Sequence, residues 1–597
     1  MATRPPRPGT AGHRGDTGTR PTHVGQQLVD RLIAYGVRHV FGCPGGQTLP
    51  MYNGMAHRRG EIDHVLMRDE RSGAFAADAY ARATGRIGVC DATVGPGASN
   101  LVSGLVEAYS SSIPVLAIVS DIPREWEHRR EFGSASQAFE QRHFLEGCVK
   151  WYGRVQTPAS LPEILHACIR IATSGRPGPT VLEIPDDIFA AEAATPTFAP
   201  APEWAMFPRV RTAPDPATIG SAVERLRSSS RPLIVVGGGA LLAGAESEVL
   251  ALVDALGCPV ATTLTGKGIV PETHPYCIGV VGRFGVPMAN KLLEAADCVV
   301  FIGSKTGQTT TLGWTLPFLD TPVIHIDVDA EELGRNYHDT VAIAADAKLG
   351  TAALALAVRG KVRPNTWDRE EIASLQRTWW EGEIAFKAAP EPGILKPQDL
   401  MRIMRRVMTD DDLFVSDASL ASGWIGGRWQ IRTAGRHFFA PRGLAGLGWG
   451  LPAAIGVSEA LRTRPPAGGA RAPRVFCLAG DGGWGYSMAD VETAARRQLP
   501  LIAVILNNSS LGWIKHSAAT RFPDGVVSED FIDVSYADAA RALGADACSV
   551  SELGAFEDAL NAAVADTRAR PHVIEAISCD IETPVLPSRT AKQQGGY

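Results

Sequence analysis

Short runs of aliphatic residues alternate with alanine-rich, helix-favouring stretches along most of the chain, and this alternation constrains the fold more than any other feature. The runs are apolar throughout, which is typical of strands buried on both faces of a parallel sheet. Parallel neighbours need crossover helices, and these cover the faces of the sheet. The sequence therefore predicts an α/β protein of doubly wound parallel sheets, with strands at 39–42, 115–120, 232–236, 299–303, 323–328, 475–479 and 501–506.

Two stretches rich in proline, alanine and threonine interrupt this pattern and divide the 597 residues into three pieces. At roughly 100 to 200 residues per domain, each piece is long enough for its own core. We therefore expect three domains, at 22–190, 217–358 and 398–584, joined by linkers at 191–216 and 359–397. The second linker should contain a short helix around Trp379 and Trp380. A disordered tail is expected at 1–21 and a C-terminal tail at 585–597.

Charge and composition exclude several classes of function. Lys and Arg number 58 against 64 Asp and Glu, a net charge of −6, which indicates binding neither to nucleic acid nor to a membrane surface. The apolar runs are shorter than the roughly 20 residues of a membrane span, and the basic N-terminus lacks the apolar core of a secretory signal. The ten cysteines are scattered without a C-x-x-C pair, which is typical of reduced thiols. We expect a cytoplasmic protein; an organelle transit peptide is the alternative for the N-terminal residues.

The strongest chemical signal lies in the third piece. The strand at 475–479 leads into Gly480-Asp481-Gly482, and the strand at 501–506 leads into Asn507-Asn508. Ligands bind at the carboxyl ends of parallel strands, so Asp481 and Asn508 would offer two hard oxygen ligands suited to Mg²⁺. The two glycines would let the backbone approach a diphosphate closely. Taken separately, each motif could be an ordinary turn; the helix and strand that separate them favour one joint site.

This pattern resembles the thiamine diphosphate (ThDP)-dependent 2-oxo acid enzymes over residues 22–584, above all the catalytic subunit of acetohydroxyacid synthase, or acetolactate synthase. The resemblance implies pyrimidine-binding, middle and diphosphate-binding domains, in that order. It implies that Asp481, the Asn508 side chain and the Ser510 carbonyl bind Mg²⁺, which in turn holds the diphosphate. It also implies a homodimer or homotetramer in which the first domain of one subunit meets the third domain of another.

In the first piece, a strand at 64–67 precedes a segment that resembles the family's glutamate motif, with Glu70 at the position that bonds the pyrimidine nitrogen of ThDP. Ala74, Ala77 and Ala81 lie on one helical face, so this helix can pack closely. A carboxyl group in an apolar setting can share a proton with that nitrogen and activate the cofactor. Taken alone, Glu70 is more simply explained as an acid favoured by the helix dipole. With the third-piece motifs in the same chain, we expect it to be catalytic.

Four further positions follow from the resemblance. Residues 441–456 resemble the family's glycine-rich loop, in which the Leu447 side chain would support the bent cofactor and the Ala445 carbonyl would accept a hydrogen bond from its 4′-amino group. Leu447 could also be ordinary core. Gln137 aligns with a glutamine near the synthase active site. Gln47 stands where the family usually has alanine, in the loop facing the thiazolium, and would either donate to a substrate oxygen or cap the next helix.

Other positions depart from the synthases. Gly303-Ser304-Lys305 replaces an arginine-bearing segment that binds FAD in the synthases, and the glycine fingerprint after the strand at 232–236 is incomplete, so FAD is in doubt. Residues 417–422 differ from the synthases' D-V-G-Q-H-Q, and the tryptophan of their acceptor pocket falls on Ser517.

The resemblance and these departures together predict a ThDP- and Mg²⁺-dependent carboligase. It would decarboxylate a 2-oxo acid donor, expected to be pyruvate, and add the acyl unit to an aldehyde or 2-oxo acid acceptor. A simple 2-oxo acid decarboxylase and a noncatalytic ThDP- or FAD-binding paralogue are the alternatives.

Overall fold

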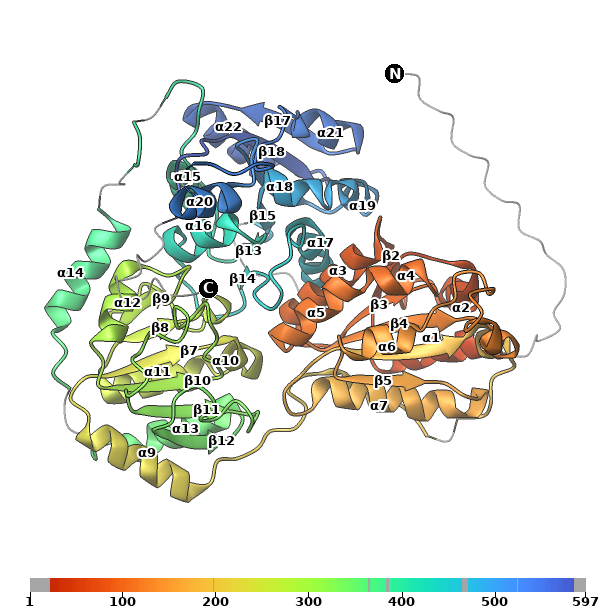
Figure 1. Cartoon of the computed structure of the whole chain (residues 1–597), viewed down its shortest axis with the longest axis horizontal. Coiled ribbons are helices and arrows are strands. Elements are labelled where there is room, and N and C mark those ends of the chain that lie inside the picture. The colour runs from red at the N-terminus through yellow and green to blue at the C-terminus, as the bar shows by residue number, and fades with distance from the viewer. Residues whose placement is uncertain are drawn as a thin grey trace.

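The computed structural model describes residues 22–196, 198–362, 365–382, 386–389, 391–463, 471–522 and 524–584. The tails expected at 1–21 and 585–597 lie outside these residues. No helix among the described residues has the length and apolar character needed to cross a membrane. Three six-stranded parallel sheets, each flanked by helices, make up the described chain (Figure 1), which confirms the α/β fold expected from the sequence.

The first sheet has the strand order β2-β1-β3-β4-β6-β5. Its strands are β1 (His39–Gly42), β2 (Asp63–Leu66), β3 (Gly88–Ala92), β4 (Val115–Asp121), β5 (Trp151–Arg154) and β6 (Thr180–Pro185). The four central strands are buried along their whole length, as expected for strands covered on both faces. The helices of this part are α1 (Val24–Ala34), α2 (Leu49–His57), α3 (Glu70–Thr84), α4 (Pro96–Asn100), α5 (Val102–Ser111), α6 (Gln141–Glu146), α7 (Leu161–Thr173) and α8 (Asp186–Ala190).

The middle sheet has the order β12-β11-β10-β7-β8-β9, which is the order of dinucleotide-binding folds. Its strands are β7 (Pro232–Val236), β8 (Val260–Thr262), β9 (Cys277–Val280), β10 (Cys298–Ile302), β11 (Val323–Asp327) and β12 (Thr340–Ala344). Its helices are α9 (Pro216–Ser228), α10 (Gly238–Ala243), α11 (Glu246–Leu256), α12 (Pro287–Glu294), α13 (Ala347–Val358) and α14 (Arg369–Trp380).

The third sheet, β14-β13-β15-β16-β18-β17, repeats the strand order of the first. Its strands are β13 (Leu413–Ser416), β14 (Phe438–Phe439), β15 (Val475–Gly480), β16 (Leu501–Asn507), β17 (Asp546–Val550) and β18 (His572–Ile577). Its helices are α15 (Pro397–Val407), α16 (Leu420–Arg428), α17 (Gly450–Arg462), α18 (Asp481–Gly485), α19 (Val491–Arg496), α20 (Gly512–Arg521), α21 (Tyr536–Ala542) and α22 (Leu553–Ala565).

The eight sequence-predicted strands agree with β1, β2, β4, β7, β10, β11, β15 and β16 to within about one residue at either end. The segment at 359–397 holds more structure than the short helix expected there. Its helix α14 has 12 residues and buries Ile372 against the middle domain, and Trp379 Nε1 donates to Gly427 O of the third domain over 2.8 Å. The segment therefore packs on both domains that it joins.

Helices α3 and α17 pack closely and join the first and third domains through one core. The approach is so tight that a Cβ on Gly456 of α17 would lie 2.1 Å from the Ala76 carbonyl oxygen of α3. Small residues on α3, including Ala74, Ala77 and Ala81, are fully or almost fully buried, as their spacing predicts. This contact fixes the position of the start of α3, in the first domain, relative to the loop that precedes α17 in the third domain.

Candidate active site

A polar cluster of the third domain lies where two neighbouring strands end. Asp481 follows β15 and begins α18, while Asn508 and Ser510 follow β16, the parallel neighbour of β15. The backbone N–H of Ser510 donates to both Asp481 Oδ2 (3.2 Å) and Asn508 Oδ1 (3.3 Å). Because one donor serves both oxygens, a carboxylate oxygen and an amide oxygen converge at this edge of the sheet.

The Asp481 carboxyl group is almost entirely removed from water, with 2% of the residue exposed. Burial raises its pKa to about 6, and backbone N–H donors of residues 482 and 508–510 act in the opposite direction. Among the described residues no cationic side chain forms an ion pair with it. A divalent cation would supply the missing positive charge, and carboxylate and amide oxygens are ligands that suit Mg²⁺.

The two glycines around Asp481 have different roles. A Cβ on Gly480 would meet no atom within 4 Å, so the main chain there borders open space. A Cβ on Gly482 would lie 2.8 Å from Leu511 Cδ2, so this glycine allows α18 to pack against the loop after β16. The open space at Gly480, beside the converging oxygens, fits a metal-bound diphosphate.

A second cluster surrounds the start of α3 in the first domain. Glu70 is the first residue of this helix, after the N-cap Asp69, and its Oε2 accepts a hydrogen bond from Asn100 Nδ2 over 3.0 Å. A Cβ on Gly97 would lie 3.3 Å from Glu70 Oε1, so the Gly-Pro-Gly turn lies against the carboxylate. Asn100 follows this turn, Gly95-Pro96-Gly97, at the end of α4, and its contact with Glu70 across 30 residues leaves no pattern in the sequence.

Gln47 and Gln137 lie near the same turn. Gln47 Oε1 accepts from the Thr93 hydroxyl over 2.9 Å, so its amide oxygen is engaged with this loop and makes no helix-capping bond. A Cβ on Gly95, which has a φ of 73°, would lie 2.3 Å from the Gln137 carbonyl oxygen. The turn at Gly95 therefore contacts Gln137, and Thr93 of the same loop contacts Gln47. The Gln137 side chain is exposed.

The glycine-rich loop before α17 carries Ala445 and Leu447. Ala445 has a φ of 60°, in the left-handed region that residues other than glycine rarely adopt. Leu447 is half-buried and belongs to none of the hydrophobic core clusters formed by the described residues. Leu447 therefore lies outside the hydrophobic cores that the described residues form.

The two clusters form their hydrogen bonds independently of each other. Glu70 bonds to Asn100 of its own domain, and Asp481 bonds to backbone of its own domain; within the described part of the chain they share no hydrogen-bonding partner. Exposed apolar side chains lie near each cluster, with Leu49 close to Gln47 and Phe531 close to Ser509. Each cluster therefore has an exposed apolar side chain beside it, Leu49 at 59% and Phe531 at 42% exposure.

A cavity of about 640 Å³ lies at the carboxyl ends of β7, β10 and β11 in the middle domain. The glycine turn that lines it is explained by packing, because a Cβ on Gly237 would lie 2.2 Å from the Gly303 carbonyl oxygen. Lys305 also lines the cavity, and its Nζ donates to the Ser110 carbonyl of the first domain. Burial lowers the Lys305 pKa to about 8. The glycines thus give no independent indication of a dinucleotide. Arg176, Arg335 and Arg436 also line the cavity.

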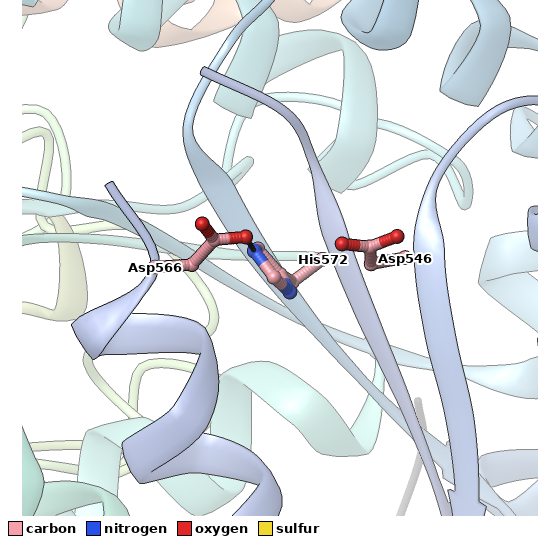
Figure 2. Close-up of side chains that lie close together, drawn as sticks. All are labelled: Asp546, Asp566 and His572. Carbon is pink, nitrogen blue, oxygen red and sulfur yellow. Dashed lines mark hydrogen bonds and ion pairs between the residues drawn. The ribbon is translucent and has the colours of Figure 1, made fainter. Parts of the chain in front are cut away.

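Figure 2 shows a third group, Asp546, Asp566 and His572, whose ligand atoms lie close enough together to hold a metal ion. Two guanidinium groups already neutralise its carboxylates. Arg568 pairs with Asp546 (2.9 Å) and Asp566 (2.8 Å), and Arg570 pairs with Asp546 (2.7 Å). These ion pairs and the His572–Asp566 contact link the starts of β17 and β18 to the end of α22, which favours a structural role.

Comparison with known proteins agrees with the division of the chain into three domains. Three family models match the chain: the N-terminal TPP binding domain of thiamine pyrophosphate enzymes at 22–145, their central domain at 219–354 and their C-terminal TPP binding domain at 417–576. The fold and these matches define the class, a three-domain thiamine pyrophosphate enzyme.

Curated relatives narrow the class further. An acetolactate synthase of Arthrospira platensis is 33% identical over 82% of this chain and 82% of its own length. A probable acetolactate synthase large subunit of Methanococcus aeolicus is 31% identical over 82% and 81%, and the isozyme 3 large subunit of Escherichia coli is 30% identical over 82% and 83%. The chain belongs to the thiamine pyrophosphate enzyme family, in the acetolactate synthase-like group.

Proposed function

We propose that this protein is a ThDP- and Mg²⁺-dependent carboligase that decarboxylates a 2-oxo acid, with pyruvate as donor, and transfers the acyl unit to an aldehyde or 2-oxo acid. The observation that carries the proposal is the convergence of Asp481 Oδ2 and Asn508 Oδ1 on one N–H at the ends of adjacent strands. The acetolactate synthase names of its relatives support the reaction class.

Each residue near the two clusters has a proposed task. Asp481, Asn508 and the Ser510 carbonyl would hold Mg²⁺, with the diphosphate against Gly480 and Gly482. Bound ThDP supplies an electron sink for cleavage of the bond next to a carbonyl carbon.

The first-domain residues and the glycine-rich loop would act on the other end of the cofactor. Glu70 would share a proton with the pyrimidine nitrogen, and its contact with Asn100 orients the carboxylate. The Ala445 carbonyl would accept from the 4′-amino group, and Leu447 would support the bent cofactor. Gln47 and Gln137 would contact the substrate.

The acceptor is proposed to be larger or more oxygenated than pyruvate or 2-oxobutyrate. Ser517 lies on α20, half-buried, where the synthases carry a tryptophan, so a large apolar wall is replaced by a hydroxymethyl group. Gln47 adds a polar group near the expected thiazolium position. A site built on hydrogen bonds rejects acceptors without the matching group more strongly than one built on methylene contacts.

The assembly is proposed to be a homodimer or homotetramer in which Glu70 of one subunit completes the Asp481 site of another. The independent hydrogen bonds of the two clusters and the exposed Leu49 and Phe531 beside them support this arrangement. A cytoplasmic location is proposed because the ten cysteines are all free, and seven of them are buried.

A product screen tests the reaction. Pyruvate is supplied with ThDP and Mg²⁺, and CO₂ release and products are followed with and without a set of acceptors. The proposal predicts acceptor-dependent acetohydroxy products, with pyruvate and 2-oxobutyrate more than about tenfold poorer acceptors than the best one found. CO₂ release with an aldehyde product and no carboligation would indicate a simple decarboxylase, and no CO₂ from any 2-oxo acid would indicate a noncatalytic paralogue.

A further inference from the structure

The loop that carries Ala445 and Leu447 runs between two buried carboxylates, neither of which belongs to the proposed Mg²⁺ site. Glu107 comes from α5 of the first domain and holds the start of the loop. Asp417 comes directly after β13 of the third domain and holds its end. Glu107 is 0% exposed and Asp417 is 1% exposed.

Glu107 accepts hydrogen bonds from four consecutive backbone N–H groups. Its Oε1 accepts from Arg442 (3.0 Å) and Gly443 (2.9 Å), and its Oε2 accepts from Leu444 (2.8 Å) and Ala445 (2.9 Å). Bonds to an ionised acceptor are roughly twice as strong as neutral ones. One side chain of the first domain therefore determines the path of four residues of the third domain.

The Glu107 carboxylate is itself held in place. Ser111 Oγ donates to it over 2.7 Å, and the buried Arg82 guanidinium donates over 3.1 Å. Burial alone would raise the pKa of Glu107, but Arg82 and the N–H donors outweigh burial and hold it below the ordinary value. The group stays ionised at neutral pH and keeps its full capacity to accept.

Asp417 holds the other end of the loop. Its carboxylate accepts from the N–H groups of Gly448 (3.1 Å) and Trp449 (3.2 Å), the residues that lead into α17. A Cβ on Gly450 would lie 3.0 Å from Asp417 Cβ, so the two segments are in close contact. Two residues, Gly446 and Leu447, lie between the anchored stretches, and Ala445 is the last residue of the first one.

The backbone at Ala445 shows why such anchoring is needed. A left-handed conformation is unfavourable for a non-glycine residue and persists only where the surroundings over-determine it. The carbonyl direction of Ala445 is set by this conformation. Without the bonds from Glu107, the loop would relax toward ordinary conformations and the carbonyl would turn.

We propose that Glu107, assisted by Asp417, is a positioning residue that fixes the Ala445 carbonyl and the Leu447 side chain in the geometry that activates ThDP. The inference rests on the proposed function, since it assigns these two groups to the cofactor. It adds that Glu107 serves the third domain of its own chain, whereas Glu70 of the same first domain is proposed to serve the partner subunit.

The test compares Glu107→Gln with Glu459→Gln in the full-length protein. The amide introduced by Glu107→Gln retains one oxygen acceptor but turns an NH₂ donor toward two N–H groups, so half of the anchor is lost. Glu459 is a matched control because it is 1% exposed and bridges the same two domains, pairing with Arg497 (2.7 Å) and His39 (3.5 Å) and not with the loop.

Two readouts separate positioning from general stability. The first is amide hydrogen exchange of residues 442–450 in the protein without cofactor. The second is the rate at which the C2 proton of bound ThDP exchanges with deuterium, measured with Mg²⁺ and no 2-oxo acid. Glu107→Gln should accelerate the amide exchange and slow the C2 exchange by about tenfold or more, the effect of losing one or two charge-assisted hydrogen bonds. Glu459→Gln should leave both within about twofold.

Either of two results would overturn the inference: a C2 exchange rate in Glu107→Gln within about twofold of wild type, or equal losses in both variants. If wild-type protein bound no ThDP, the proposed function would fail instead. The amide exchange of 442–450 would still test whether the hydrogen bonds from Glu107 hold the loop. If Glu107→Gln does not fold, Glu107→Asp replaces it. This variant keeps the charge beside Arg82 but is too short to reach all four N–H groups, and the same two outcomes decide.

Discussion

Glu70 is the residue proposed to share a proton with the cofactor, and its surroundings favour an ionised, oriented carboxylate. It lies at the first turn of α3, where the helix favours negative charge, and it is oriented by Asn100 and the adjacent Gly-Pro-Gly turn. Neutralising it while keeping its shape should remove proton sharing and leave the cofactor pocket intact.

We therefore expect Glu70→Gln to lower turnover by about 10²–10⁴-fold, the usual contribution of a general acid or base, with ThDP still bound. Steady-state rates and calorimetric ThDP affinity check this. Asp69→Asn is the control, because Asn also caps the helix, and it should retain most of the activity. Near-full turnover in Glu70→Gln would show that the glutamate has no catalytic role.

Asp481 is the proposed Mg²⁺ ligand whose loss should weaken cofactor binding most directly. Asp481→Ala removes a hard ligand from the site of two converging oxygens, so ThDP affinity in the presence of Mg²⁺ should collapse while the protein still folds. Titration calorimetry and circular dichroism measure the two properties. Asp566→Asn, in the group of Figure 2, should leave ThDP and Mg²⁺ binding unchanged, because Arg568 already occupies that carboxylate. Unchanged ThDP binding in Asp481→Ala would refute the assignment.

At the scale of elements, the contact between α3 and α17 depends on the absence of one side chain. Gly456→Ala would put a Cβ 2.1 Å from the Ala76 carbonyl oxygen, and neither helix backbone can move without disturbing the shared core. We expect the free energy of unfolding to fall by about 1–3 kcal/mol or more, as for other overpacked cores.

Urea denaturation checks this prediction, and α22 offers a matched control. A Cβ on Gly554 would meet no atom within 4 Å, so Gly554→Ala should be neutral or stabilising by about 0.5–1 kcal/mol. A midpoint for Gly456→Ala at or above that of wild type would mean that α3 and α17 can separate easily.

The turn after β7 leads to a prediction about flavin. Its glycines are needed for contact with Gly303, and Lys305 bridges to the first domain, so we expect FAD to be absent or dispensable. Purified protein should lack the flavin absorption band near roughly 450 nm, and added FAD should not raise activity. A yellow preparation with one flavin per subunit, inactive after flavin removal, would contradict this.

At the scale of the whole molecule, the proposed assembly predicts complementation between inactive chains. If sites form between subunits, a mixed dimer of Glu70→Gln and Asp481→Ala chains contains one site with both residues intact. Random re-association of equal amounts should restore about a quarter of the wild-type sites. Each variant alone serves as the control, and a mixture that stays inactive after proven subunit exchange would place Glu70 and Asp481 of each site in one chain.

The positions of the buried strands and of the residues at their ends can be predicted from the sequence, for physical reasons. Buried parallel strands such as β15 and β16 need unbroken aliphatic runs, so their ends are visible, and Asp481 and Asn508 follow those ends directly. Glu107 was missed because its partners lie 335 to 338 residues away and offer only main-chain N–H groups, which leave no pattern in sequence. The extent of α14 was underestimated because its register is set by packing of Ile372 and Trp379 on other domains.

The bonds from Glu107 also bear on how this protein can be altered. Because they reach only main-chain nitrogen, the Leu444 side chain, which is 48% exposed, can vary without loosening the loop. Arg442 is different, since it lies over the Phe284 ring and its Nε donates to the Pro441 carbonyl. Proline, which has no N–H, is the exception at 442–445. Position 444 is thus a natural place for sequence diversity, since substitutions other than proline there leave the hydrogen bonds from Glu107 in place.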